Sequence, residues 1–298
     1  MITTLNSSLV GTRLKPYETT ITMRQTTNHA AAIEDGNPRY FDDTKEHGLV
    51  SHPMFPVAVT WPVLSRLDHF IESDNFPTQV LLTQVHYSEH LILHRLVRPN
   101  DALTIKGELK ALIPHRAGTH AVIALEALDK GGDPVFTEYI GAMLRGVDCG
   151  KQGITGSIPV IPESNKTGDI PVWTSNVHIN HLMPFLYDGC TDIEFPIHTS
   201  VQFARDVGLP GIILQGTATL GLAVRDIVDR QTDKDPSRVT RIACNFSGMV
   251  IPGTDIRIIC TDQVTHQHHT DIFFTVLNSE NKKAIRNGYV QIKRSHHG

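Results

Sequence analysis

The chain of 298 residues repeats one layout twice, and this repeat constrains its fold more than any other feature of the sequence. Each half begins with a strand-like segment, continues through helix-like segments around a polar loop, and ends with four strand-like runs. Two short motifs recur at nearly the same separation, because residues 98–105 resemble residues 251–258, and residues 37–40 resemble residues 195–198. A period this long indicates a duplicated domain. A helix followed by antiparallel strands, twice, predicts an α+β fold in which each sheet wraps around a central helix.

A stretch rich in Gly, Pro and Ser separates the two halves and is typical of a linker. We therefore expect one domain at residues 1–146, a linker at 147–171 and a second domain at 172–298. The expected helices are 25–34, 55–67, 180–189, 200–209 and 214–230. The expected strands are 19–23, 79–93, 101–113, 120–128, 135–147, 172–179, 238–250, 254–264, 270–278 and 287–294.

Charge and composition exclude several classes of protein. The chain has 27 Lys and Arg against 31 Asp and Glu, a net charge of −4, so it has no basic footprint for nucleic acid or for a membrane surface. No apolar run approaches the roughly 20 residues of a membrane-spanning helix, and the first twenty residues lack a signal-peptide pattern. The four cysteines have no Cys-x-x-Cys spacing, which indicates free thiols in a reducing compartment. We expect a cytoplasmic protein.

The loop CTDIEFPIHTS, residues 190–200, is the best candidate for an acid/base site. Asp192, Glu194 and His198 lie within seven residues around a Pro-Ile pair. A carboxylate and an imidazole in one loop can contact a single water, as general acid/base chemistry requires. The run 265–269 places His266 and His268 on one strand face, but no Cys or carboxylate accompanies them at a recognisable spacing, so we expect no metal ion.

NPRYFDD with the downstream GLVSHPMFP, and the segment FPIHTSVQFARDVGLPGIILQGTATLGLAVRDI, resemble the two halves of a MaoC-like double hot-dog protein. That family includes (R)-specific 2-enoyl-CoA hydratases. Its pattern is an Asp-x-Asn-Pro-x-His loop, a helix, a Gly-Leu or Gly-Phe pair, and an Ile-x-His-Gly turn that opens the hot-dog helix. The resemblance implies a double hot-dog fold and a lyase that hydrates or dehydrates an unsaturated or 3-hydroxy acyl compound, without a cofactor.

The resemblance carries His198, Pro196 and Gly216 over directly, but not the acid. Counted back from His198, the family's Asp falls on Ile193 and its Asn on Phe195. Asp192 or Glu194 is therefore the predicted partner of His198, and a longer or reshaped loop would bring either one into place.

In the first half, Tyr40 takes the place of His198, so this half resembles the one that shapes the substrate tunnel. Gln215 stands where the family has the His of its His-Gly turn. Gln215 and the amides at the start of the following helix are expected to polarise the substrate carbonyl. The predicted substrate contacts are Gln215, Gly216, Thr217, Phe195, Asn37 and Tyr40, with His47 as a further tunnel residue.

Two other functions remain open at this point. The same cavity, with Phe195 at a polar position, fits an isomerase or cyclase of a specialised-metabolite pathway that steers its substrate by shape and hydrogen bonds. A binding subunit with a dead site is the other alternative, although such a site has no need of His198. We expect a small-molecule or acyl-thioester substrate, no nucleic acid and no membrane partner, with monomer and homodimer both open.

Overall fold

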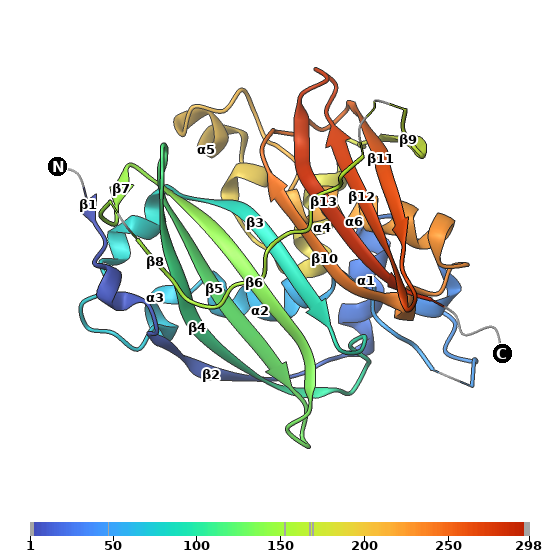
Figure 1. Cartoon of the computed structure of the whole chain (residues 1–298), viewed down its shortest axis with the longest axis horizontal. Coiled ribbons are helices and arrows are strands. Elements are labelled where there is room, and N and C mark those ends of the chain that lie inside the picture. Colours follow the sequence, from blue (N-terminus) through green and yellow to red (C-terminus); the bar gives the residue numbers. More distant parts are fainter. Residues whose placement is uncertain (1–2, 47, 152, 167, 169, 295–298) are drawn as a thin grey trace.

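The computed structural model describes residues 3–46, 48–151, 153–166, 168 and 170–294. Its main sheet follows the order β2-β4-β5-β6-β3-β10-β13-β12-β11-β9, and β8 pairs with β4 (Figure 1). The strands are β1 Thr3–Thr4, β2 Arg13–Thr20, β3 Gln84–Leu93, β4 Ala102–His115, β5 Gly118–Leu128, β6 Pro134–Arg145, β7 Val147–Asp148, β8 Ile154–Thr155, β9 Trp173–His178, β10 Val239–Phe246, β11 Asp255–Thr265, β12 His269–Leu277 and β13 Lys283–Lys293. β1 and β7 form a separate parallel pair.

The two halves of the sequence meet in the middle of this sheet. The first five strands of the order precede residue 146 and the last five follow residue 172. β3 pairs antiparallel with β10, so that Leu91 lies opposite Ile242 and Glu89 opposite Cys244. The sheet is therefore continuous from one half to the other, and the residues of β3 lie at its centre.

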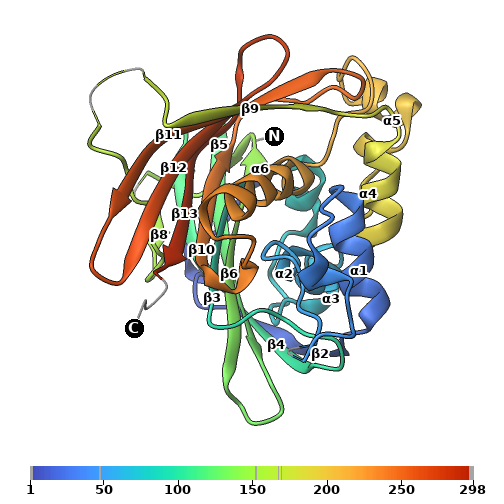
Figure 2. The same ribbon diagram turned by 90° about the vertical axis from the view of Figure 1, so that its right-hand side faces the viewer.

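The helices lie on one side of the sheet (Figure 2). They are α1 Met23–Ala32, α2 Pro56–Leu64, α3 Leu67–Phe70, α4 Met183–Thr191, α5 Val201–Asp206 and α6 Gly216–Gln231. α6 is the longest of them, and most of its side chains are buried, because it crosses the concave face of the strands of the second half. α2 is shorter and contains Pro62, which removes a backbone hydrogen bond from the helix. The predicted α+β double hot-dog fold, with a helix held by each sheet, is confirmed.

Several predicted strands have other boundaries in the structure; for example, 238–250 is strand only over Val239–Phe246, and 287–294 lies within the longer Lys283–Lys293. Residues 21–23 are not strand, since the Thr22 side chain and Gln25 form a capping box that begins α1. Thr78–Thr83 is a 3-10 turn that follows Pro77, and strand geometry begins only at Gln84. The expected linker, 147–171, carries only the short strands β7 and β8 in its described part.

Two further expectations concern the whole chain. All four cysteines are free. No helix in the part of the chain that the structure describes is long and apolar enough to cross a membrane.

Candidate active site

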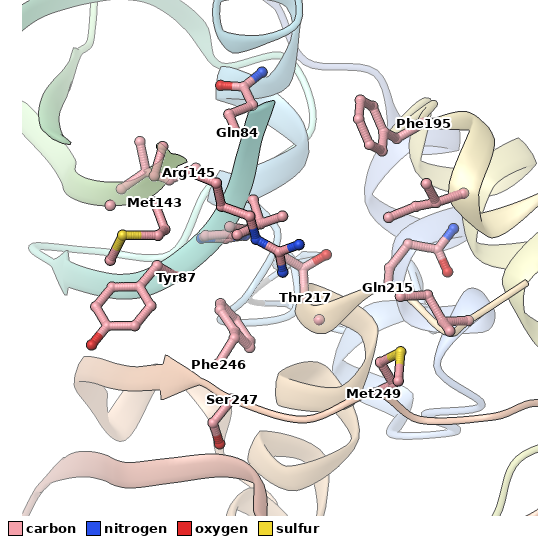
Figure 3. A pocket seen from close by; sticks show the side chains of 18 of the residues that line it. Gln84, Tyr87, Met143, Arg145, Phe195, Gln215, Thr217, Phe246, Ser247 and Met249 are labelled. Carbon is pink, nitrogen blue, oxygen red and sulfur yellow. The ribbon is translucent and has the colours of Figure 1, made fainter. Parts of the chain in front are cut away.

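A cavity of about 1610 Å³ lies between the sheet and the helices, and both halves of the chain line it. Figure 3 shows Gln84, Tyr87, Met143 and Arg145 of the first half on one side, and Phe195, Gln215 and Met249 of the second half on the other. The walls contributed by β4, β5, α2 and α3 are mostly aliphatic. They include Leu109, Leu112, Ala121, Ile123, Val57, Leu64 and Leu67. Exposed cationic side chains also border the cavity: Arg116, Arg145, Lys282 and Lys283.

His198 lines this cavity and is held in one orientation. It ends the 3-10 turn Pro196–His198, whose first residue is Pro, and it is 9% exposed. Its Nδ1 lies 2.8 Å from the carbonyl oxygen of Ile213. Because a carbonyl can only accept, Nδ1 carries the hydrogen and Nε2 keeps its lone pair. Burial lowers the pKa of His198 to about 4, so the imidazole is a neutral base at neutral pH.

The structure does not bring the predicted acids to His198. Asp192 ends α4 in a left-handed conformation with φ of 56°, and both Asp192 and Glu194 are exposed. Ile193 and Phe195 line the cavity instead. Burial alternates along this loop, with Ile193 buried between the exposed Asp192 and Glu194, and neither acid lines the cavity that contains His198. The prediction that Asp192 or Glu194 faces a common water with His198 is therefore corrected.

The start of α6 borders the same cavity as His198. Gln215, Gly216 and Thr217 all line it, and the Gln215 side chain does not cap the helix. Instead Nε2 of Gln215 donates to the Pro184 carbonyl at 3.0 Å, which leaves its buried Oε1 without a partner among the described residues. The first N–H groups of a helix have no partner within it and lie at the positive end of its dipole. The free N–H groups at the start of α6, rather than the Gln215 side chain, can therefore donate to a negatively charged oxygen.

Two buried carboxyl groups at this cavity wall were not predicted from the sequence. Glu89 and Glu138 are each 0% exposed. Burial raises the pKa of both well above the usual range, and the charge of Glu89 raises the pKa of Glu138 further. Glu138 lines the cavity, and His86, which also lines it, lies 3.1 Å from Glu89. The sequence contained a signal for these buried carboxyl groups, because apolar or aromatic residues stand two positions to either side of each Glu, on the same strand face. They are Tyr87 and Leu91 for Glu89, and Phe136 and Ile140 for Glu138.

The first-half loop holds a different buried cluster. Asn37 is buried, accepts from Arg39 N and donates to the Lys234 carbonyl, while Tyr40 is fully buried. Neither residue lines the main cavity, so their prediction as tunnel contacts is corrected: their loop packs on α1, and Asn37 borders a second cavity with residues of α6. His47 lies outside the described residues.

This loop also contains an acid that the sequence reasoning missed. Asp35 precedes Asn37 with the Asp-x-Asn-Pro spacing of the family pattern, and it borders a second cavity of about 410 Å³. Nε2 of the fully buried His52 lies 3.8 Å from the Asp35 carboxylate. Burial raises the pKa of Asp35 to about 6. The two halves thus divide the family motif, with Asp and Asn in the first half and His in the second.

The β11–β12 turn differs from the sequence expectation in one respect. Ligand atoms of His266, His269 and Asp271 lie within 4.8 Å of one another, so a carboxylate does accompany the histidines. The strand register, which places Asp271 opposite Val264, creates this proximity. His268 is not part of the group.

Two family descriptions match the chain, one in each half. The FAS1-like, dehydratase domain region matches residues 8–138, and the MaoC like domain matches residues 177–284. The second match contains His198 and the whole of α6.

Three known proteins illustrate the similarity. The peroxisomal multifunctional enzyme type 2 of Drosophila melanogaster is 26% identical over 216 residues, covering 71% of this chain and 34% of that protein. Enoyl-CoA hydratase ChsH3 of Mycobacterium tuberculosis is 33% identical over 109 residues, covering 37% of this chain and 36% of that protein. The chain therefore spans about a third of the length of these two relatives. A MaoC-like dehydratase from Phytophthora capsici superimposes with a TM-score of 0.83 over 98% of this chain and 100% of its own, at 19% identity. That likeness shows a shared fold.

Proposed function

Because the chain belongs to the MaoC-like dehydratase double hot-dog family, we propose that it adds water to a 2-enoyl thioester or removes it from a 3-hydroxyacyl thioester. The observation that carries this proposal is the neutral His198 beside the open N-terminus of α6. A base that is unprotonated at neutral pH and a donor group for an enolate oxygen are two of the components that hydration needs.

In the direction of hydration, Nε2 of His198 takes a proton from water, and the water oxygen bonds to C3 of the substrate. The electron pair of the double bond moves toward the thioester carbonyl, whose oxygen becomes negative. The N–H groups of Gly216 and Thr217 stabilise that oxygen, as the uncapped first turn of α6 would allow. A proton delivered to C2 completes the addition.

The two kinds of cavity wall support an acyl-CoA substrate. The aliphatic surface from β4, β5 and α2 suits an acyl chain. The exposed Arg116, Arg145, Lys282 and Lys283 at its border suit the phosphates of CoA. The name of the Mycobacterium relative also points to enoyl-CoA.

The direct test is to incubate the purified chain with trans-2-enoyl-CoA esters of increasing length and to follow loss of the conjugated thioester absorbance. We expect hydration to the 3-hydroxyacyl product. Formation of a rearranged or cyclised product without net uptake of water would instead favour the isomerase or cyclase alternative. Ile193 and Phe195 in place of the family's polar residues are the observation on which that second candidate rests.

The acyl-chain wall gives a specific prediction. Ala121 on β5 lines the cavity next to the aliphatic residues Leu112 and Ile123. Ala121→Phe should fill the part of the cavity beside Leu112 and Ile123. We expect kcat/KM for a long-chain enoyl-CoA to fall by about tenfold to a hundredfold, the range for one methylene excluded from an apolar pocket. Turnover of the four-carbon ester by the same variant is the internal control. An equal loss for both esters would show that the acyl chain lies elsewhere.

A further inference from the structure

The proposed reaction needs a proton donor for C2, and the acid that the family loop would supply is absent beside His198. We propose that Glu138 delivers this proton, and that Glu138 and Glu89 share one proton between them when the site is empty. This inference rests on the proposed function, because it names the acid partner of the same site.

The register of the sheet places the two carboxyl groups together. In the antiparallel pair of β3 and β6, Glu89 lies opposite Ile140 and Leu91 lies opposite Glu138. Paired residues point to the same face, and residues two apart on one strand share that face, so Glu89 and Glu138 are diagonal neighbours on one surface. That surface is the inner one, because Ile140 and Glu138 both line the cavity.

A chain of contacts connects this pair to the proposed position of the substrate carbonyl. Nε2 of His86 lies 3.1 Å from Glu89, and the His86 ring is 4.5 Å from that of Phe246. Phe246 in turn packs on the first residue of α6, since a Cβ on Gly216 would lie 3.0 Å from it. Glu138, the member of the pair that lines the cavity, is therefore linked through Glu89, His86 and Phe246 to the open N–H groups of α6, and His198 lines the same cavity.

The groups that face the pair are uncharged or weakly basic. They are Thr60 of α2, Tyr187 of α4, His86 of β3 and Cys244 of β10. Burial lowers the pKa of His86 to about 4, so it is neutral at neutral pH. None of the four carboxyl oxygens makes a well-aligned hydrogen bond to the described residues. Two buried carboxyl groups without a cation cannot both ionise, so one of them retains a proton.

Glu138 rather than Glu89 holds the transferable proton. It is the member that lines the cavity, while Glu89 lies behind it against His86 and Cys244. The Glu89 charge raises the pKa of Glu138, whereas contact with Glu138 favours the charged form of Glu89.

The steps balance as follows. His198 takes a proton from water, the hydroxyl oxygen bonds to C3, and C2 receives the proton of Glu138. The pair is then transiently left without its proton, and the positive charge gained by His198, which lines the same cavity as Glu138, keeps the net charge of the site unchanged. The proton on His198 returns to the pair through water, so that the net change is one water added across the double bond. Dehydration runs through the same steps in reverse.

The test compares Glu138→Gln with Glu126→Gln, an exposed glutamate on the neighbouring strand β5. Gln keeps the size and hydrogen-bonding groups of Glu138 but cannot transfer a proton. We expect kcat for hydration to fall about 10²–10⁴-fold, the usual contribution of a general acid. The unfolding temperature should be unchanged or higher, because a neutral amide replaces one of two buried carboxyl groups. Glu126→Gln should match the wild type in both measurements.

If Glu138 had a purely structural role, removing the Glu89 charge would not change the pH profile of hydration. The Glu89→Gln variant tests this. Without the Glu89 charge, Glu138 should lose its proton at lower pH. The alkaline limb of the hydration profile, where activity falls because the acid is ionised, should therefore shift to lower pH. The proposal would be overturned if kcat of Glu138→Gln stayed within about tenfold of the wild-type value and its pH profile were unchanged.

A measurement that needs no turnover separates this proposal from the proposed function. Infrared difference spectra of wild type minus Glu138→Gln at pH 8 should contain the carbonyl band of a protonated carboxyl, and octanoyl-CoA should shift it. If the wild type hydrates nothing but the band is present and shifts, the hydratase function fails and the proton-sharing pair stands. If the band is missing, or if octanoyl-CoA leaves it unchanged, the pair is not the donor, whatever the activity.

Discussion

Replacing His198 with Ala is expected to lower kcat for hydration of a trans-2-enoyl thioester by about 10²–10⁴-fold, because the reaction loses the base that takes the proton from water. The side chain that disappears is held by one hydrogen bond, from Nδ1 to the Ile213 carbonyl, at the wall of an existing cavity. We therefore expect the variant to fold and to bind substrate with a similar KM. Steady-state kinetics together with a thermal unfolding curve measure both outcomes.

His120→Ala is the matched control for this change. Burial lowers the pKa of His120 to about 4 as well, and its Nε2 lies 3.1 Å from the Ser88 hydroxyl, but it does not line the cavity. Loss of an equally perturbed imidazole outside the cavity should leave kcat unchanged. Equal losses in the two variants would mean that His198 acts only through stability.

The pH dependence of the wild type gives a second readout on His198. Its pKa is lowered to about 4, so the neutral base predominates at higher pH and is protonated as the pH falls through that value. We expect kcat/KM to fall on the acid side near pH 4 rather than near the ordinary histidine value of about 6.5. The His198→Ala variant should lack this acid limb.

The repeat and helix α6 were predictable from sequence, because both rest on long periodic segments. α6 combines a Gly start with apolar residues at helical spacing, and its buried face follows from that pattern. The four final strands of each half were predicted as well, because each is a long run rich in strand-forming residues, although their ends differ in the structure. Such features depend on many residues at once, so one irregular position does not change them.

The acid partner could not be read in the same way. The loop from Asp192 to His198 joins a helix to a 3-10 turn, and no periodicity fixes which of its side chains point inward. The left-handed residue at Asp192 sets that phase, and it puts Ile193 and Phe195 in the cavity. The carboxyl pair was missed for another reason. Glu89 and Glu138 are 49 positions apart, and only the register of β3 on β6 brings them together.

Replacing Gly216 with Pro is expected to lower kcat about 10²–10³-fold, the usual cost of removing one donor to a developing oxyanion. Proline at the first position of a helix removes only an N–H that has no partner within the helix, and its fixed φ suits that position. Gln215 already has φ of −57° and ψ of 138°, the extended conformation that a residue before proline prefers.

Gly216→Ala is the matched variant, because it adds the same Cβ, 3.0 Å from Phe246, and keeps the N–H. The ratio of kcat between the Ala and Pro variants therefore isolates the N–H group from the steric change. If the two variants lose activity equally, the loss comes from displacement of Phe246, and the carbonyl oxygen is stabilised by the Thr217 N–H instead.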